Sequence, residues 1–82
     1  MKHDNITMVI SQDRDIILDQ KSIVTVKAVQ SGDDTYINIT NSYGDIYTVA
    51  TYSYPEAAAS EIDRYIDETI HGDTGVKFFM FS

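Results

Sequence analysis

The sequence predicts an α+β domain in which an antiparallel β-meander is followed by one α-helix and a final strand. Two observations support this prediction. Residues 54–71 are the only stretch whose apolar side chains recur every three or four residues. The residues before them form short alternating runs separated by turn-forming residues, which is typical of successive strands. Because a helix with one apolar stripe needs a surface to cover, we expect it to pack on one face of the sheet.

The helix has a recognisable start and end. Pro55 suits the first helical turn, where its missing N–H would have no partner. Ser53 followed by Glu56 indicates a capping box; if the helix begins one residue later, Tyr54 is the cap residue and the box is lost. Gly72 is expected to end the helix in the left-handed conformation. The expected apolar stripe is Ala58, Ile62, Tyr65, Ile66, Thr69 and Ile70, and the expected polar side is Glu56, Ser60, Asp63, Arg64, Asp67, Glu68 and His71. Arg64 and Glu68 form an i,i+4 pair.

Four to five short strands are expected before the helix. They fall at residues 6–10, 15–19, 22–30, 35–41 and 46–52, after a polar arm at residues 1–5. In the third strand Val24, Val26 and Ala28 share a face, and in the fourth Ile37 and Ile39 do. Residues 31–34 and 42–45 are hairpin turns, and Gly44 is the expected left-handed residue of the second.

The last strand, residues 76–81, is apolar on both faces. If Val76, Phe78 and Met80 lie toward the helix, Phe79 and Phe81 are left on the other face. Two exposed phenylalanines are unusual in a small monomer. Two readings stay open: the rings are covered by the N-terminal arm, or they lie in a subunit interface or a partner contact.

Size and charge limit the function. The chain has 82 residues and no cysteine, so we expect one domain of residues 1–82 with a small core and no disulfide. Because a small core without such cross-links often needs a second copy, we also expect a homo-oligomer, dimer or higher.

Thirteen acidic against six basic residues give a net charge of −7, which argues against binding to the DNA or RNA backbone. No stretch is long enough to span a membrane, and residues 1–11 lack the apolar core of a signal peptide; we therefore expect a cytoplasmic protein.

The sequence offers no catalytic residue, metal site or cofactor site, and we expect no enzyme. His3 and His71 have no evident partner for acid–base chemistry. Asp13, Asp15 and Asp19 resemble a calcium loop, but the glycine and the closing glutamate of such a loop are missing.

Candidate binding residues are instead those that offer a large contact area or a positive charge. Tyrosine is favoured at binding surfaces because it brings much area at low entropic cost. The candidates are Tyr36, Tyr43, Tyr47, Tyr54, Arg64 and Lys77, with Phe79 and Phe81 as the candidate oligomer or partner interface.

The chain resembles a group of small, mostly uncharacterised α+β proteins of Firmicutes and their phages. The matching segments are residues 8–11 (MVIS), 16–19 (IILD), 52–70 and 76–81. The Asp-Gly usual in the first turn of that group is Asp13-Arg14 here, which predicts a different turn type. The resemblance implies a bacterial or phage origin and a small α+β fold, and it brings no catalytic residues.

Three functions follow as hypotheses. The first is a phage-encoded, anti-defence inhibitor that binds a host or defence protein through tyrosines and an acidic surface. The second is an oligomeric sponge that holds a nucleotide-type signal at subunit interfaces, where tyrosines stack the base and Arg14, Lys27, Arg64 or Lys77 meets the phosphate. The third is a structural or assembly protein without a ligand.

Overall fold

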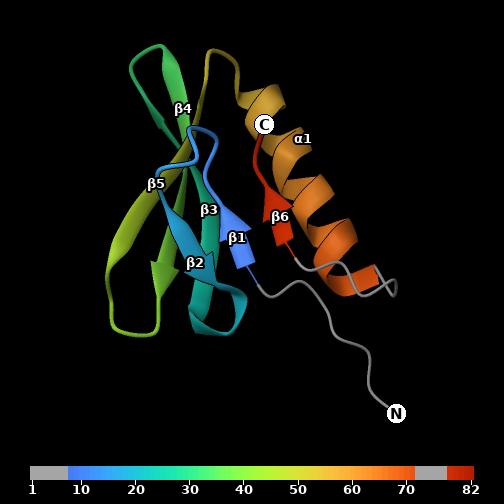
Figure 1. Ribbon diagram of the computed structural model, residues 1–82. Helices are drawn as coiled ribbons and strands as arrows, with labels where there is room; N and C mark the ends of the chain where they lie inside the picture. The colour runs from blue at the N-terminus through green and yellow to red at the C-terminus, as the bar shows by residue number, and fades with distance from the viewer. Residues whose placement is uncertain (1–7, 72–77) are drawn as a thin grey trace.

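Two three-stranded sheets and one helix make up the computed structural model, which describes residues 8–71 and 78–82 (Figure 1). The order is β1 (Met8–Ile10), β2 (Ile17–Asp19), a 3₁₀ turn η1 (Gln20–Ser22), β3 (Ile23–Ser31), β4 (Asp34–Asn41), β5 (Ile46–Tyr52), α1 (Pro55–Ile66), a π turn η2 (Asp67–His71) and β6 (Phe78–Met80). This confirms the predicted α+β class. The expected arm at residues 1–5 and the expected end at Gly72 lie outside the described residues.

The meander sheet has the strand order β3-β4-β5, with both pairs antiparallel. The alternation predicted for β4 is confirmed, because Ile37 and Ile39 are fully buried while Tyr36, Asn38 and Thr40 lie on the other face. Its second hairpin turns at Gly44 with φ 89°, so the predicted left-handed glycine is also confirmed.

A β-bulge corrects the interpretation of β3. Ile23 pairs with Asn41 and Thr25 with Thr40, which leaves Val24 as the extra residue. Val24 is therefore exposed, while its neighbour Ile23 packs against the core. A second bulge in β5, where Ile37 pairs with Ala50 but Asn38 pairs with Thr48, leaves Val49 unpaired. Val49 and Ala50 are consequently both buried.

The small sheet has the order β2-β1-β6 and differs from a simple meander. β1 runs antiparallel to β2 but parallel to β6, and Figure 1 shows β6 lying between β1 and α1. The Phe81 N–H donates to the Ile10 carbonyl at 3.0 Å and extends this parallel pairing. The inward row of the sheet, Leu18, Val9 and Phe79, is part of the core.

The first turn of the chain places a residue other than glycine in the left-handed conformation. Arg14 has φ 64°, in the region that glycine usually occupies. The buried Ser11 side chain holds this turn: its Oγ accepts from the Asp15 and Ile16 N–H groups at 3.1 and 3.0 Å. These hydrogen bonds from Asp15 and Ile16 to Ser11 stabilise the turn and offset the conformational cost of the positive φ at Arg14.

Helix α1 begins at Pro55, the later of the two predicted starts. Tyr54 is the N-cap residue without a side-chain cap, and Pro55 is the first helical residue, so the capping box of Ser53 does not form. At the other end the Thr69 Oγ1 donates to the Tyr65 carbonyl at 2.7 Å. Such a side-chain bond competes with the regular ladder, in line with the π turn that continues the helical segment to His71. The predicted helical range is confirmed.

An aromatic cluster corrects the predicted face of the last strand. Phe79 and Phe81 are each 1% exposed and contact each other and Tyr65, with ring centroids 4.9 to 5.9 Å apart, whereas Phe78 is 60% exposed. The prediction placed Phe79 and Phe81 away from the helix and was wrong. Both alternating sets of this strand are apolar, and pairing with β1 selects the set with two phenylalanines for the interior.

Two neighbouring phenylalanines should respond differently to the same substitution. Phe79→Ala should lower the free energy of unfolding by about 3–5 kcal/mol, because it leaves a cavity beside Tyr65. Phe78→Ala should change it by less than about 1 kcal/mol, because the ring is exposed. Chemical denaturation followed by circular dichroism measures both, and equal losses would contradict the assigned face.

Candidate functional site

The predicted tyrosines do not form one site. Tyr43 is 85% exposed at the β4–β5 turn, and Tyr54, also exposed, precedes α1. The seven residues of β5 lie between them and span roughly 23 Å. Tyr36 lies on the outer face of the meander sheet, whereas Tyr47 packs against the core. Lys77 lies outside the described residues.

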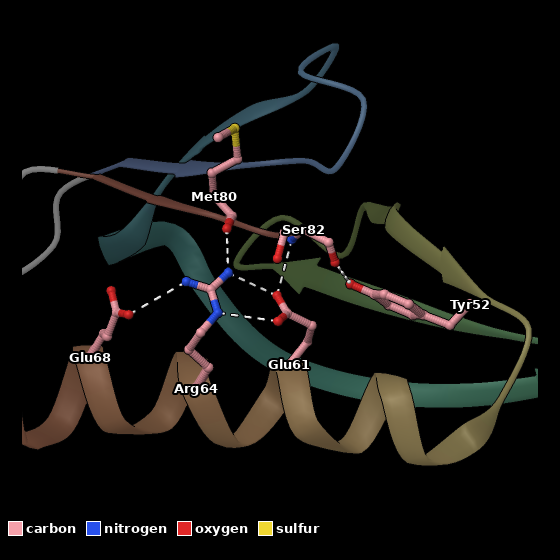
Figure 2. Close-up of polar contacts among 6 residues, drawn as sticks. All are labelled: Tyr52, Glu61, Arg64, Glu68, Met80 and Ser82. Atoms are coloured by element: carbon pink, nitrogen blue, oxygen red, sulfur yellow. Dashed lines mark hydrogen bonds and ion pairs between the residues drawn. The ribbon is translucent and has the colours of Figure 1, made fainter.

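Arg64 is held within the domain rather than extended into solvent (Figure 2). Its Nη2 donates to the Glu61 Oε1 at 2.9 Å and to the Met80 carbonyl at 2.6 Å, and its Nη1 lies 3.4 Å from the Glu68 Oε2. The predicted Arg64–Glu68 pair is confirmed. The guanidinium carbon also lies 4.3 Å from the centre of the Phe79 ring, a cation–π contact.

Glu61 links the helix to Ser82, just beyond β6. Its Oε1 accepts from the Ser82 N–H at 3.1 Å as well as from Arg64. The hydrogen bond from Arg64 lowers the pKa of Glu61, with partial burial acting in the opposite direction. Glu61 in turn raises the pKa of Arg64. Both groups therefore stay ionised at neutral pH.

Tyr52 completes this contact from β5. Its hydroxyl donates to the Ser82 carbonyl at 2.6 Å (Figure 2). Burial, together with the nearby Glu61 charge, raises the pKa of Tyr52 to about 12. The phenol stays protonated and acts as a donor. We call Arg64, Glu61, Glu68 and Tyr52, together with the backbone of Met80 and Ser82, the β6 clasp. These contacts fix the end of the last strand against the helix and β5.

The surface with binding character is the outer face of the small sheet. Two cross-strand rows point away from the core, and five of their six side chains are apolar. One row is Asp19, Met8 and Phe78, and the other is Ile17, Ile10 and Met80. Met8, Ile17 and Phe78 are exposed, and Ile10 and Met80 are partly exposed. An apolar group on one sheet face is typical of a contact site for a protein.

Sequence reasoning missed this face, although the signal was present. The strands read MVI, ILD and FFM, with hardly any polar residue between the apolar ones. Such continuous runs are typical of strands that are covered on both faces. The structure covers one face with the core and leaves apolar side chains exposed on the second face.

The described residues also bear on metal binding and on membrane-spanning helices. Within residues 8–71 and 78–82, no group of three or more histidine, cysteine or acidic side chains could hold a metal ion. Among the helices that the structure describes, none is both long and apolar enough to cross a membrane.

Comparisons with family models, curated proteins and solved structures found no match. The fold and its surfaces therefore define a class only: a small α+β domain whose small sheet exposes an apolar face.

The β6 clasp should make the free energy of unfolding depend on pH in the acidic range. Because the pKa of Glu61 is lowered in the folded state, its contribution is complete above the ordinary value of 4.5 and is lost as pH falls through the lowered pKa. Glu61→Gln should therefore destabilise the domain at pH 7 and have a smaller effect in acid. Denaturation curves of both proteins at neutral and acidic pH measure this, and a difference independent of pH would contradict it.

Tyr52 should act at the alkaline end. Its raised pKa means that the stabilising hydroxyl is fully protonated below its ordinary value of 10.0 and is lost as pH rises toward about 12. Relative to Tyr52→Phe, the wild type should lose stability across that interval. Thermal unfolding of both proteins at several alkaline pH values provides the measurement, and parallel curves would show that Tyr52 contributes no such effect.

Proposed function

We propose that this chain is a non-enzymatic protein-binding domain, and that the outer face of the small sheet is its contact surface. The observation that supports this is the set of five apolar side chains, Met8, Ile10, Ile17, Phe78 and Met80, on one exposed sheet face. Contact surfaces with an apolar centre bind by excluding water, and a few large side chains contribute most of the energy. The two methionines add a side chain that adapts to different partners.

The charge of the chain indicates the chemistry of the partner. A net charge of −7 favours a protein whose apolar patch is surrounded by basic residues. The resemblance to phage proteins suggests a host or defence protein as that partner, which the chain would inhibit by covering a site in the bacterial cytoplasm. Long-range attraction would increase the association rate, and the apolar centre would hold the complex.

The nucleotide sponge has less support. A phosphate site needs convergent cations, and the Arg64 guanidinium already binds Glu61 and Glu68. The tyrosines expected to stack a base are divided between two sheet faces and two ends of β5.

Capture of a partner from bacterial lysate tests the proposal when a patch variant is paired with a matched control. In the patch variant Ile17→Thr and Phe78→Thr remove apolar area from the outer face. In the control Val24→Thr and Ile46→Thr do so elsewhere on the surface; Ile17 and Val24 are each 63% exposed. Threonine suits all four strand positions.

The patch variant should retain less than about a tenth of the captured partner, which corresponds to the loss of one central side chain, while the control retains it. Equal capture by both variants would reject this face as the contact surface. Capture that disappears at high salt with both variants would indicate mimicry of nucleic acid by the acidic surface instead, because screening weakens charge pairing but not apolar contact.

A further inference from the structure

β3 is the longest open sheet edge among the described strands. It has nine residues and pairs with β4 alone. The other edge of the meander sheet, β5, is occupied: the Gln12 N–H donates to the Val49 carbonyl at 2.7 Å, and the Gln12 Oε1 accepts from the Thr51 N–H at 3.0 Å. The edge strands of the small sheet, β2 and β6, have three residues each.

β3 also has few of the features that keep sheet edges apart. Natural edge strands are protected by charges, proline, bulges or short length. After the bulge at Val24, residues 25–31 contain no proline and no acidic residue, and Lys27 is their one charge. The strand is rich in β-branched residues, which favour pairing.

Charge selects the partner for this edge. Two copies of a chain with net charge −7 repel each other over most of their surfaces. Along β3 each copy presents one lysine and no carboxylate, so the repulsion is least there. An antiparallel pair of identical strands is also self-complementary, as a twofold dimer requires.

The β3–β4 register fixes which backbone groups are available. A two-residue turn at Gly32 and Asp33 closes on the pair Ser31 and Asp34. Because hydrogen-bonded pairs alternate along an antiparallel ladder, the N–H and C=O groups of Val26, Ala28 and Gln30 point away from β4.

We propose that two copies of this chain pair through β3, antiparallel, with Ala28 on the twofold axis. Val26 of one copy then pairs with Gln30 of the other, and Lys27 lies opposite Val29. This is the longest register that ends before the bulge and keeps the two Lys27 side chains from lying opposite each other. The two meander sheets join into one, and each copy keeps its small sheet free. The proposal does not depend on the proposed function.

Sedimentation equilibrium over a wide range of protein concentration, without any partner, tests this dimer. Wild type should approach twice the monomer mass. Ala28→Pro should remain monomeric, because proline removes an outward N–H that the dimer needs. The fold should be retained, because β4 does not use that N–H and edge strands tolerate proline. An unchanged circular dichroism spectrum should show that the variant is folded.

A charge pair at residue 29 tests the register. Val29→Glu and Val29→Lys both remove the valine, but they place opposite charges across from Lys27 of the second copy. Because each contact occurs twice in the dimer, Val29→Glu should tighten dimerisation about fivefold and Val29→Lys weaken it about fivefold. Net charge alone predicts the reverse order, because the glutamate makes the chain more acidic.

Three outcomes would overturn the proposal: a wild type that is monomeric at every concentration, a dimer that survives Ala28→Pro, or the reverse order of the two residue 29 variants. A dimer that is lost with Ile17→Thr and Phe78→Thr instead would also overturn the proposal, because it would assign self-association to the small sheet. Failure of the β3 variants to disrupt the dimer leaves the proposed function unaffected, since that function is tested by capture of a different protein.

Discussion

The packing of Tyr65 against Phe79 and Phe81 is the interaction on which the rest of the structure depends. Three strands of three residues each are too short to form an independent sheet. The small sheet is held because its inward row meets the helix through these rings, with centroids 5.3 and 5.9 Å from that of Tyr65. Arg64 covers the Phe79 ring and binds the Met80 carbonyl, so the same helix turn fixes both the side chain and the backbone of β6.

This interaction determines what the opposite face of the small sheet presents. Once Phe79 lies inward, strand alternation places Phe78 and Met80 outward, and the register places Met8 and Ile10 beside them. The core requires only the inward row. Polar residues at the outward positions would serve folding equally well and solubility better. The fold therefore does not explain the five apolar side chains at the outward positions, whereas the proposed contact with a protein partner would account for them.

Local patterns in the sequence predicted the elements that depend on local rules. The alternation of β4, the turn at Gly44 and a helix start within a residue of Pro55 need only neighbouring residues. The face of β6 could not be predicted, because Phe78 and Phe79 are equally apolar and the choice depends on pairing with β1 at the other end of the sequence. The bulge at Val24 likewise places Ile23 rather than Val24 against the core, while Val26 keeps the predicted face. Arg64 was placed on the solvent side by periodicity, but its length lets it reach back to β6. The tyrosines chosen by residue type lie on different faces and turns of the fold. The exposed apolar face was not predicted, because it forms only when β1, β2 and β6 lie side by side, and the sequence did not reveal that strand order.

The acidic charge and the apolar face are best understood together. An uncharged domain with this face exposed would associate with itself through it, because two copies of one flat apolar sheet face can stack. Net repulsion between copies opposes this stacking, whereas it does not oppose a basic partner. β3 differs, since it offers directional backbone hydrogen bonds and has no acidic side chain. In the two proposals, charge distribution separates these surfaces: copies of the chain associate at the β3 edge, and the outer face of the small sheet binds a different protein.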